Sequence, residues 1–181
     1  MYPPPNPLFV ELELHARKDG VPIISREAGR FLSTIVTAMQ ANRILEVGTG
    51  YGYSTLWMAL AQPRMGRIWT IEPDAAHTEI ALSYFRRAGE DDYIELFDTP
   101  ALELLENFPQ RNLDIVFIAA NKSEYHRYLE LVIPMLKLSG LVLFNDCLAQ
   151  ADFAERFLNH PTLDATILPL GEGIGIGARR Q

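Results

Sequence analysis

Short apolar runs alternate along the chain with longer stretches in which apolar residues recur every three or four positions. A run such as Leu113–Ile118 is apolar at nearly every position, which is typical of a strand buried on both faces of a parallel sheet. The spacing of three or four is typical of amphipathic helices. Strands are predicted over Arg43–Val47, Arg67–Glu72, Ile94–Phe97, Leu113–Ile118 and Leu141–Phe144. Helices are predicted from Ser25 to Met39 and over Ser54–Ala61, Ala75–Arg87, Ala101–Asn107, Glu124–Leu136 and Asp152–Asn159.

The end of the chain has a different pattern. Thr166–Leu170 and Ile174–Ala178 flank the turn Gly171-Glu172-Gly173, as expected for a hairpin. Five strand–helix units and this hairpin predict an α/β fold with a doubly wound, mostly parallel, seven-stranded sheet that ends in an antiparallel hairpin. Ligands of such sheets bind at the carboxyl ends of the strands. We expect residues 1–20 to form an N-terminal arm, extended over its proline-rich first seven residues, and residues 21–181 to form one domain.

Composition and charge exclude several classes of protein. The 181 residues are 48% hydrophobic and 22% charged, which is typical of a globular domain rather than a disordered chain. The net charge of −7 disfavours nucleic acid or an anionic membrane surface as the main partner. The single cysteine, Cys147, excludes a disulfide framework. Without an apolar run of membrane-spanning length or a signal peptide, we expect a cytoplasmic location.

The sharpest local motif is a glycine loop between a predicted strand and a predicted helix, in the segment Leu45–Ser54. Glycines at alternate positions allow a tight turn and a close approach of a ligand to the backbone. Glu46 precedes the first glycine by two positions, and Glu72 ends the next strand. A carboxylate at the position of Glu72 can accept hydrogen bonds from both hydroxyls of a ribose, and Glu46 would bind a ligand ammonium.

These two carboxylates discriminate between possible ligands. Two negative charges would disfavour the pyrophosphate of a dinucleotide, so the charges favour a cationic nucleoside such as S-adenosylmethionine. Two other readings remain open: a tight turn that binds no ligand, and a nicotinamide-dependent oxidoreductase of the same fold.

Several motifs, in order, resemble the S-adenosylmethionine-dependent O-methyltransferases of the catechol and caffeoyl-coenzyme A type, a class I, Rossmann-like methyltransferase family. The resemblance covers about residues 20–180. Its blocks are Ile24–Gly29, Arg43–Ser54, Ile71–Asp74, Thr99–Leu102, Phe117–Tyr125, Gly140–Leu148 and Leu168–Ile176.

The resemblance implies a set of cofactor-binding residues. Glu46, Gly48, Thr49 and Ser54 would hold the methionyl part, Glu72 would bind the ribose, and Asp98 and Ala101 would border the adenine. Gly50, Pro73 and Ala119 complete the expected cofactor site.

The family also binds a divalent metal, through a carboxylate after one strand and an Asp-Asn pair after the next. Here the first carboxylate is replaced by Ala119, a second family acid by Asn121, and the pair reads Asn145-Asp146. Only Asn145 and Asp146 could ligate a metal such as magnesium, and one carboxylate with one amide is a poor site for it. The metal is therefore doubtful. The family's lysine is retained as Lys122, which with Asp146 is the candidate catalytic pair.

The sequence thus predicts a methyltransferase that uses S-adenosylmethionine to methylate an oxygen of a small-molecule acceptor, without requiring a metal. A protein that binds the cofactor but has lost catalysis is the alternative, because the cofactor loop is intact and the metal ligands are not. The resemblance further implies a homodimer.

Overall fold

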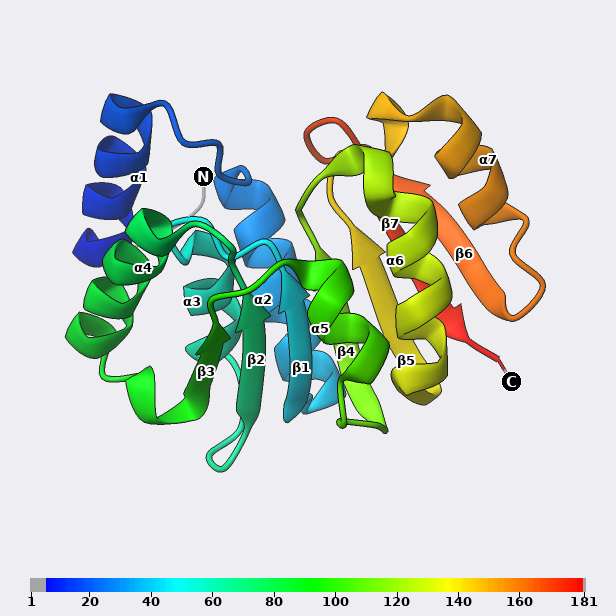
Figure 1. The fold of residues 1–181 in the computed structure, drawn as a ribbon, viewed down its shortest axis with the longest axis horizontal. Helices are drawn as coiled ribbons and strands as arrows, with labels where there is room; N and C mark the ends of the chain where they lie inside the picture. The colour runs from blue at the N-terminus through cyan, green and yellow to red at the C-terminus, as the bar shows by residue number, and fades with distance from the viewer. Residues whose placement is uncertain (1–5, 181) are drawn as a thin grey trace.

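The computed structural model describes residues 6–180, which form one layer of strands between two layers of helices (Figure 1). The larger helices are α1 (Pro7–Asp19), α2 (Arg26–Met39), α3 (Tyr53–Ala59), α4 (Ala75–Ala88), α5 (Ala101–Asn107), α6 (Tyr125–Val132) and α7 (Ala151–Leu158). The strands are β1 (Arg43–Val47), β2 (Arg67–Ile71), β3 (Ile94–Phe97), β4 (Leu113–Ile118), β5 (Leu136–Phe144), β6 (Leu163–Leu168) and β7 (Ile174–Arg179). Single 3-10 turns cover Asp91–Tyr93, Lys122–Glu124, Ile133–Met135 and Cys147–Ala149.

The seven strands form one sheet in the order β3-β2-β1-β4-β5-β7-β6. All neighbours from β3 to β5 pair in parallel, whereas β7 pairs antiparallel with both β5 and β6. The strand order reverses between β1 and β4, so the loops that follow these two strands lie side by side. This is the position at which doubly wound sheets bind ligands. The predicted fold class is confirmed.

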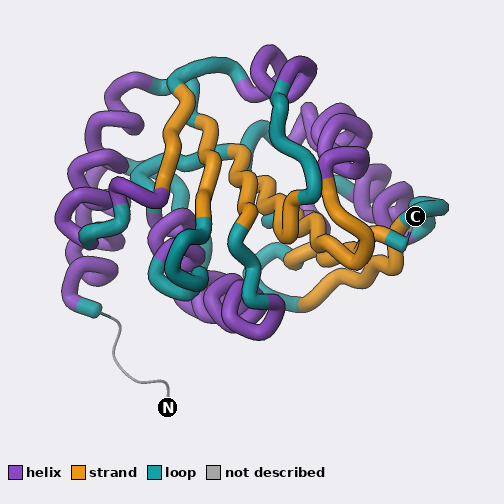
Figure 2. The backbone as a smooth tube through the Cα atoms, turned by 90° about the horizontal axis from the view of Figure 1, so that it is seen from below, coloured by secondary structure: helices purple, strands orange, loops and turns teal. Residues whose placement is uncertain are grey.

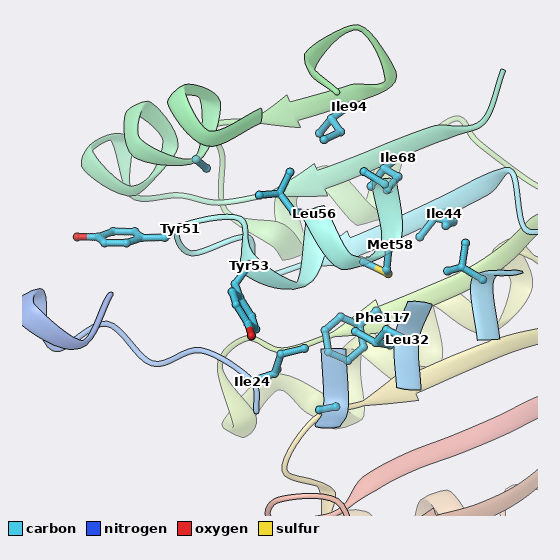
Figure 3. Packing of buried hydrophobic residues seen from close by; sticks show 14 of the residues in the cluster. Ile24, Leu32, Ile44, Tyr51, Tyr53, Leu56, Met58, Ile68, Ile94 and Phe117 are labelled. Atoms are coloured by element: carbon cyan, nitrogen blue, oxygen red, sulfur yellow. The ribbon is translucent and has the colours of Figure 1, made fainter. Parts of the chain in front are cut away.

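Each face of the sheet is covered by its own set of helices, as the tube view shows (Figure 2). Helices α1 to α4 pack on the face that carries Ile44 and Ile68, and α5 to α7 pack on the face that carries Leu45 and Trp69. Figure 3 shows Ile44, Ile68 and Ile94 from neighbouring strands in a row against Leu56 of α3. Both faces are buried, which explains why these strands are apolar at successive positions.

The structure differs from the sequence prediction over residues 125–144. The expected helix Glu124–Leu136 ends earlier, because α6 stops at Val132 and a 3-10 turn containing Pro134 follows. A proline ring prevents an α-helix from continuing through it. Strand β5 accordingly begins at Leu136, earlier than the expected Leu141, and the hairpin strands are also longer than expected.

The expectation of an N-terminal arm over residues 1–20 is wrong for its described part. Residues 1–5 lie outside the described residues, but Pro7–Asp19 is helix α1, with Asn6 as its N-cap and Gly20 as its C-cap. Phe9 and Leu12 are buried in the same core as α2 and α3. The Phe9 ring stacks on that of Trp57 with 4.3 Å between centroids. This helix therefore belongs to the core.

A buried carboxyl group joins β1, β2 and α3. Glu46 is fully buried, and its carboxyl accepts hydrogen bonds from Ser54 Oγ at 2.5 Å, from Thr70 Oγ1 at 2.7 Å and from the Thr55 hydroxyl. Thr70 also shares a 2.6 Å hydrogen bond with the hydroxyl of Thr49 in the glycine loop. Burial raises the pKa of Glu46 to about 7, although the three hydroxyls act in the opposite direction.

Within residues 6–180, no helix is both long and apolar enough to cross a bilayer.

Truncating α1 in the core tests its contribution to stability. Leu12 is fully buried, so Leu12→Ala should lower the free energy of unfolding by about 2–5 kcal/mol, because it leaves a cavity. Leu14 lies on the same helix and is 58% exposed, so Leu14→Ala should change that free energy by less than about 0.5 kcal/mol. Urea denaturation of both variants measures the difference. Equal midpoints would show that α1 is not part of the core.

The buried Glu46 carboxyl predicts a dependence of stability on pH. Between its unfolded pKa near 4.5 and its folded pKa of about 7, the unfolded chain has lost a proton that the folded protein keeps. Raising the pH therefore favours unfolding in this window. From about pH 5 to about pH 8 the stability of the wild type should fall by about 2 kcal/mol relative to Glu46→Gln.

Denaturation at several pH values checks this, with Glu103→Gln, at an exposed carboxyl, as the matched control. A difference between wild type and Glu46→Gln that is constant with pH would contradict the assignment.

Candidate functional site

A cavity of about 790 Å³ opens at the carboxyl ends of β1, β2, β4 and β5. Its lining comes from segments far apart in the sequence: 21–25 between α1 and α2, 47–50 of the glycine loop, 71–73, 100–101, 119–122, 145–146 and 170–172. The loops after the parallel strands meet here because parallel strands all end at the same edge of the sheet. The cavity thus lies where the sequence predicts a ligand.

The glycine loop needs glycine at positions where the backbone is left-handed and crowded. Gly48 has φ 94°, and a Cβ at this residue would lie 2.3 Å from the carbonyl oxygen of Ala119. Gly52 has φ 85°, and a Cβ there would lie 2.4 Å from the Phe85 ring. A side chain at either position would displace a neighbouring element. Gly48 therefore allows the ends of β1 and β4 to lie in close contact, and Gly52 allows the loop to pack closely on α4.

Three backbone N–H groups of this loop that border the cavity already donate hydrogen bonds within the protein. Gly48 and Thr49 donate to the carbonyl oxygen of Ile71 at 3.0 and 3.2 Å. Gly50 donates to Glu72 Oε2 at 2.7 Å. A phosphate-binding loop instead directs free N–H groups at its ligand. The N–H groups of Gly48, Thr49 and Gly50 are therefore not free to bind a pyrophosphate.

Glu72 faces the cavity from the end of β2 and is only 7% exposed. Its Oε1 accepts a hydrogen bond from Asp74 N at 3.1 Å, in addition to the bond from Gly50 to Oε2. His77 Nδ1 lies 3.6 Å from Oε1. A carboxylate oxygen accepts two hydrogen bonds, so each oxygen retains acceptor capacity for a hydroxyl in the cavity. The backbone bonds fix the orientation of this carboxylate.

The expected cofactor residues divide into those that line the cavity and those that do not. The lining includes Gly48, Thr49, Gly50, Ser54, Glu72, Pro73, Ala101 and Ala119. Glu46 does not line it, because its carboxyl lies beneath the loop and accepts the bonds from Ser54, Thr55 and Thr70. The expected contact of Glu46 with a ligand ammonium is therefore absent from this geometry. Asp98 is exposed and also lies outside the lining. Pro100, two residues later, does line the cavity.

The two candidate catalytic residues contact each other. Lys122, which begins the 3-10 turn after β4, places its Nζ 2.9 Å from Asp146 Oδ2, after the end of β5. Both residues line the cavity. Asp146 has φ 50°, and the preceding carbonyl, that of Asn145, accepts a 2.8 Å hydrogen bond from the buried Tyr125 hydroxyl. Tyr125 and the 3-10 turn thus fix the two partners on one side of the cavity.

The residues present do not fit a divalent metal. Ala119 has no ligand atom, and Asn121 Oδ1 caps its own turn by accepting bonds from the Ser123 N–H at 3.2 Å and from its hydroxyl at 3.0 Å. The remaining carboxylate, Asp146, is paired with the Lys122 ammonium. Within residues 6–180, no three histidine, cysteine or acidic side chains are grouped as a metal site. One amide and one carboxylate already paired with a cation are a poor donor set for magnesium.

Sequence reasoning missed several residues that line the cavity. The segment Val21–Ser25 covers one side of it, and Tyr53 and His77 also contribute. A signal was present for the first, because Ile24 and Ser25 belong to the motif at the start of α2. His77 lies near Glu72 only through tertiary structure, so its place in the site leaves no local signal in the sequence. Cys147 is buried, and burial raises its thiol pKa to about 11.

The comparisons with known proteins agree with this geometry. Residues 9–162 match the family model described as O-methyltransferase. A catechol O-methyltransferase from Mycobacterium tuberculosis is 32% identical over 160 residues, which cover 80% of this chain and 73% of the relative.

Two solved structures share the fold over nearly the whole chain. A methyltransferase from Geobacter sulfurreducens superposes with a TM-score of 0.91 at 26% identity, covering 100% of this chain and 92% of the other. An O-methyltransferase from Bacillus cereus, solved in complex with S-adenosylhomocysteine, has a TM-score of 0.86 at 25% identity and covers 98% and 92%. The family model and the relative confirm the resemblance carried by the sequence motifs: this chain belongs to the O-methyltransferase family.

Proposed function

We propose that this protein transfers the methyl group of S-adenosylmethionine to an oxygen of a small-molecule acceptor, and that its own residues do this without a divalent metal. The observation that carries the proposal is the cavity itself. It combines the glycine loop, a fixed carboxylate at Glu72 and the polar pair Lys122–Asp146. The S-adenosylhomocysteine complex of the Bacillus cereus relative, whose fold is the same, supports this choice of cofactor.

The cofactor is assigned to the part of the cavity above β1 and β2. We place the ribose hydroxyls on Glu72, the methionyl part against Gly48, Thr49 and Ser54, and the adenine beside Ala101. Gly50, Pro73 and Ala119 border it in this proposal. The sulfonium charge suits this region, because the Glu72 carboxylate lies in the cavity and the N–H groups of Gly48, Thr49 and Gly50 are not free to bind an anion.

Methyl transfer is a direct displacement at carbon, so alignment of the acceptor oxygen with the carbon–sulfur bond provides most of the rate enhancement. Exclusion of water from the cavity adds to it, since the charged sulfonium becomes neutral as the methyl group leaves. Lys122 and Asp146 are the polar groups assigned to the acceptor. None of these contributions requires a metal, and the donor set described above does not fit one.

A second candidate function is favoured by one observation. Ala119 and Asn121 stand where the family pattern has acids, so the protein could bind the cofactor without catalysing transfer. Tight binding of the cofactor without turnover of any phenol, catechol or hydroxamate would favour this alternative. A homodimer and a cytoplasmic location remain predictions that rest on the resemblance and the sequence.

Calorimetric titration with S-adenosylhomocysteine tests the proposed cofactor site. We expect micromolar binding, and we expect Glu72→Gln to weaken it about tenfold or more, because a charge-assisted pair of hydrogen bonds to the ribose is lost. Glu79→Gln, at an exposed carboxyl on α4, is the matched control and should bind as the wild type does.

The same titration tests the role of a metal and of the alternative cofactor. EDTA should leave the affinity for S-adenosylhomocysteine unchanged, magnesium alone should produce no binding heat, and NAD should not compete. Absence of binding heat with S-adenosylhomocysteine would refute the proposed function. If the wild type binds magnesium and Asp146→Asn does not, the protein has a metal site at Asp146.

A further inference from the structure

The pair Lys122–Asp146 lies where the family pattern leads one to expect a metal. Lys122 follows β4 and Asp146 follows β5, neighbouring strands of the sheet whose ends form one side of the cavity. Their side chains are 38% and 28% exposed, so both remain accessible to a molecule in the cavity. Asp146 fixes the Lys122 ammonium, and the bond from Tyr125 to the Asn145 carbonyl fixes the backbone beside Asp146.

Charge distribution makes this ammonium distinctive. Among the described residues that line the cavity, Lys122 is the one lysine or arginine, whereas the acidic residues are Glu72, Glu124, Asp146 and Glu172. The Glu124 carboxylate accepts a hydrogen bond from the Tyr128 hydroxyl, which also lines the cavity. An acceptor that enters beside the cofactor therefore meets one cationic donor.

We propose that the Lys122 ammonium takes the place of the metal and binds the acceptor through one anionic oxygen, so that the acceptors are compounds with a single ionised oxygen, phenolate or carboxylate, on an apolar body. This inference rests on the proposed function. Val21, Ile24 and Leu170, which line the same cavity, provide the apolar surface for that body.

The geometry of an ammonium explains the preference for one oxygen. A metal ion can bind two neighbouring oxygens of a diol, because it has several coordination positions. The ammonium has three N–H donors, and at 2.9 Å one of them is directed at Asp146. The other two can bind one oxyanion, and the single positive charge of the ammonium matches one negative charge on the acceptor. A second adjacent hydroxyl on the acceptor thus gains no partner of comparable strength.

The reaction then needs no base. A lone pair on the acceptor oxyanion forms the new oxygen–methyl bond while the carbon–sulfur bond of the sulfonium breaks, and its electron pair remains on sulfur. The products are a neutral ether or ester and the neutral thioether S-adenosylhomocysteine, so one positive and one negative charge cancel and no proton moves. An ammonium carries no lone pair, so Lys122 acts here as a donor and not as a proton acceptor.

This role differs from that of a base in its kinetic effect. The negative charge on the acceptor is greatest before transfer and disappears during it, so Lys122 binds the ground state at least as well as the transition state. Loss of such an interaction raises KM and changes kcat little. Loss of a base lowers kcat. Arginine separates the two roles as well, because its guanidinium donates hydrogen bonds but does not deprotonate in proteins.

The first experiment measures binding of 4-nitrophenolate to the protein loaded with S-adenosylhomocysteine, in EDTA, from the change in its absorbance. We expect Lys122→Met to weaken binding about tenfold or more, and Lys122→Arg to bind within about threefold of the wild type. Lys137→Met is the matched control, because Lys137 pairs with Asp114 at the opposite edge of the sheet and lies outside the cavity. 4-Nitrobenzoate in a parallel titration distinguishes carboxylate from phenolate acceptors.

The second experiment measures transfer of the labelled methyl group to the same two compounds and to 4-nitrocatechol. The inference predicts turnover of at least one singly charged compound in EDTA, a raised KM with a similar kcat for Lys122→Met, and no gain from magnesium with the catechol.

Three results would overturn the inference. In the first, the wild type binds both anions no more tightly than Lys122→Met does. In the second, the enzyme methylates only the catechol, and only in magnesium. In the third, Lys122→Arg is as inactive as Lys122→Met, and both have a lowered kcat. Retention of S-adenosylhomocysteine binding in these cases would leave the proposed cofactor function intact. Loss of that binding in the wild type would instead refute the cofactor function itself.

Discussion

The buried carboxyl of Glu46 is the interaction on which the rest of the site depends. It lies on the central strand β1, beneath the glycine loop, and accepts hydrogen bonds from hydroxyls on α3 and β2. Burying a carboxyl group is costly unless its hydrogen-bonding capacity is satisfied. Ser54, Thr55 and Thr70 satisfy it, and in doing so they fix the start of α3 and the loop above it. Thr49 joins the same network through Thr70.

The position of the loop then determines which ligand the site can accept. Because Gly48 and Thr49 donate to Ile71, and Gly50 donates to Glu72, the loop contributes its shape and a fixed carboxylate rather than free N–H groups. An anionic phosphate gains nothing from these three N–H groups. A cationic nucleoside gains both the close approach allowed by the glycines and the acceptors of Glu72. Glu46 thus serves the cofactor indirectly, by positioning the residues that border it.

The acceptor side of the cavity is formed by other residues, which differ from the family pattern. Replacement of the family's acids by Ala119 and Asn121 removes negative charge from the end of β4, and the Lys122–Asp146 pair becomes the polar feature of this region. This chain keeps the cofactor loop of the family but differs on the acceptor side. The difference therefore concerns the acceptor and the way it is bound more than the chemistry of methyl transfer. The cofactor side and the acceptor side of the cavity are therefore tested by separate experiments.

The parts of this structure that could be predicted from the sequence are those governed by local pattern. β1 and β4 have the expected bounds, because buried parallel strands appear as continuous apolar runs, and the glycine spacing located the cavity. Helix α1 was missed, since the prolines at the start of the chain obscured its apolar face.

The contacts that depend on long-range packing could not be predicted. Thr70 approaches Glu46 from another strand, and Asp146 meets Lys122 across the ends of two strands. Neither pairing leaves a periodic signal. The same holds for Asp98, whose exposure depends on how the chain turns after β3.

A crystal structure with S-adenosylhomocysteine bound tests the central claim most directly. We predict that the ribose hydroxyls donate hydrogen bonds to Glu72. The Glu46 carboxyl should keep its bonds to Ser54, Thr55 and Thr70 and should not contact the cofactor. A cofactor whose amino group bonds to Glu46 through a broken hydroxyl network, or one bound outside this cavity, would contradict it.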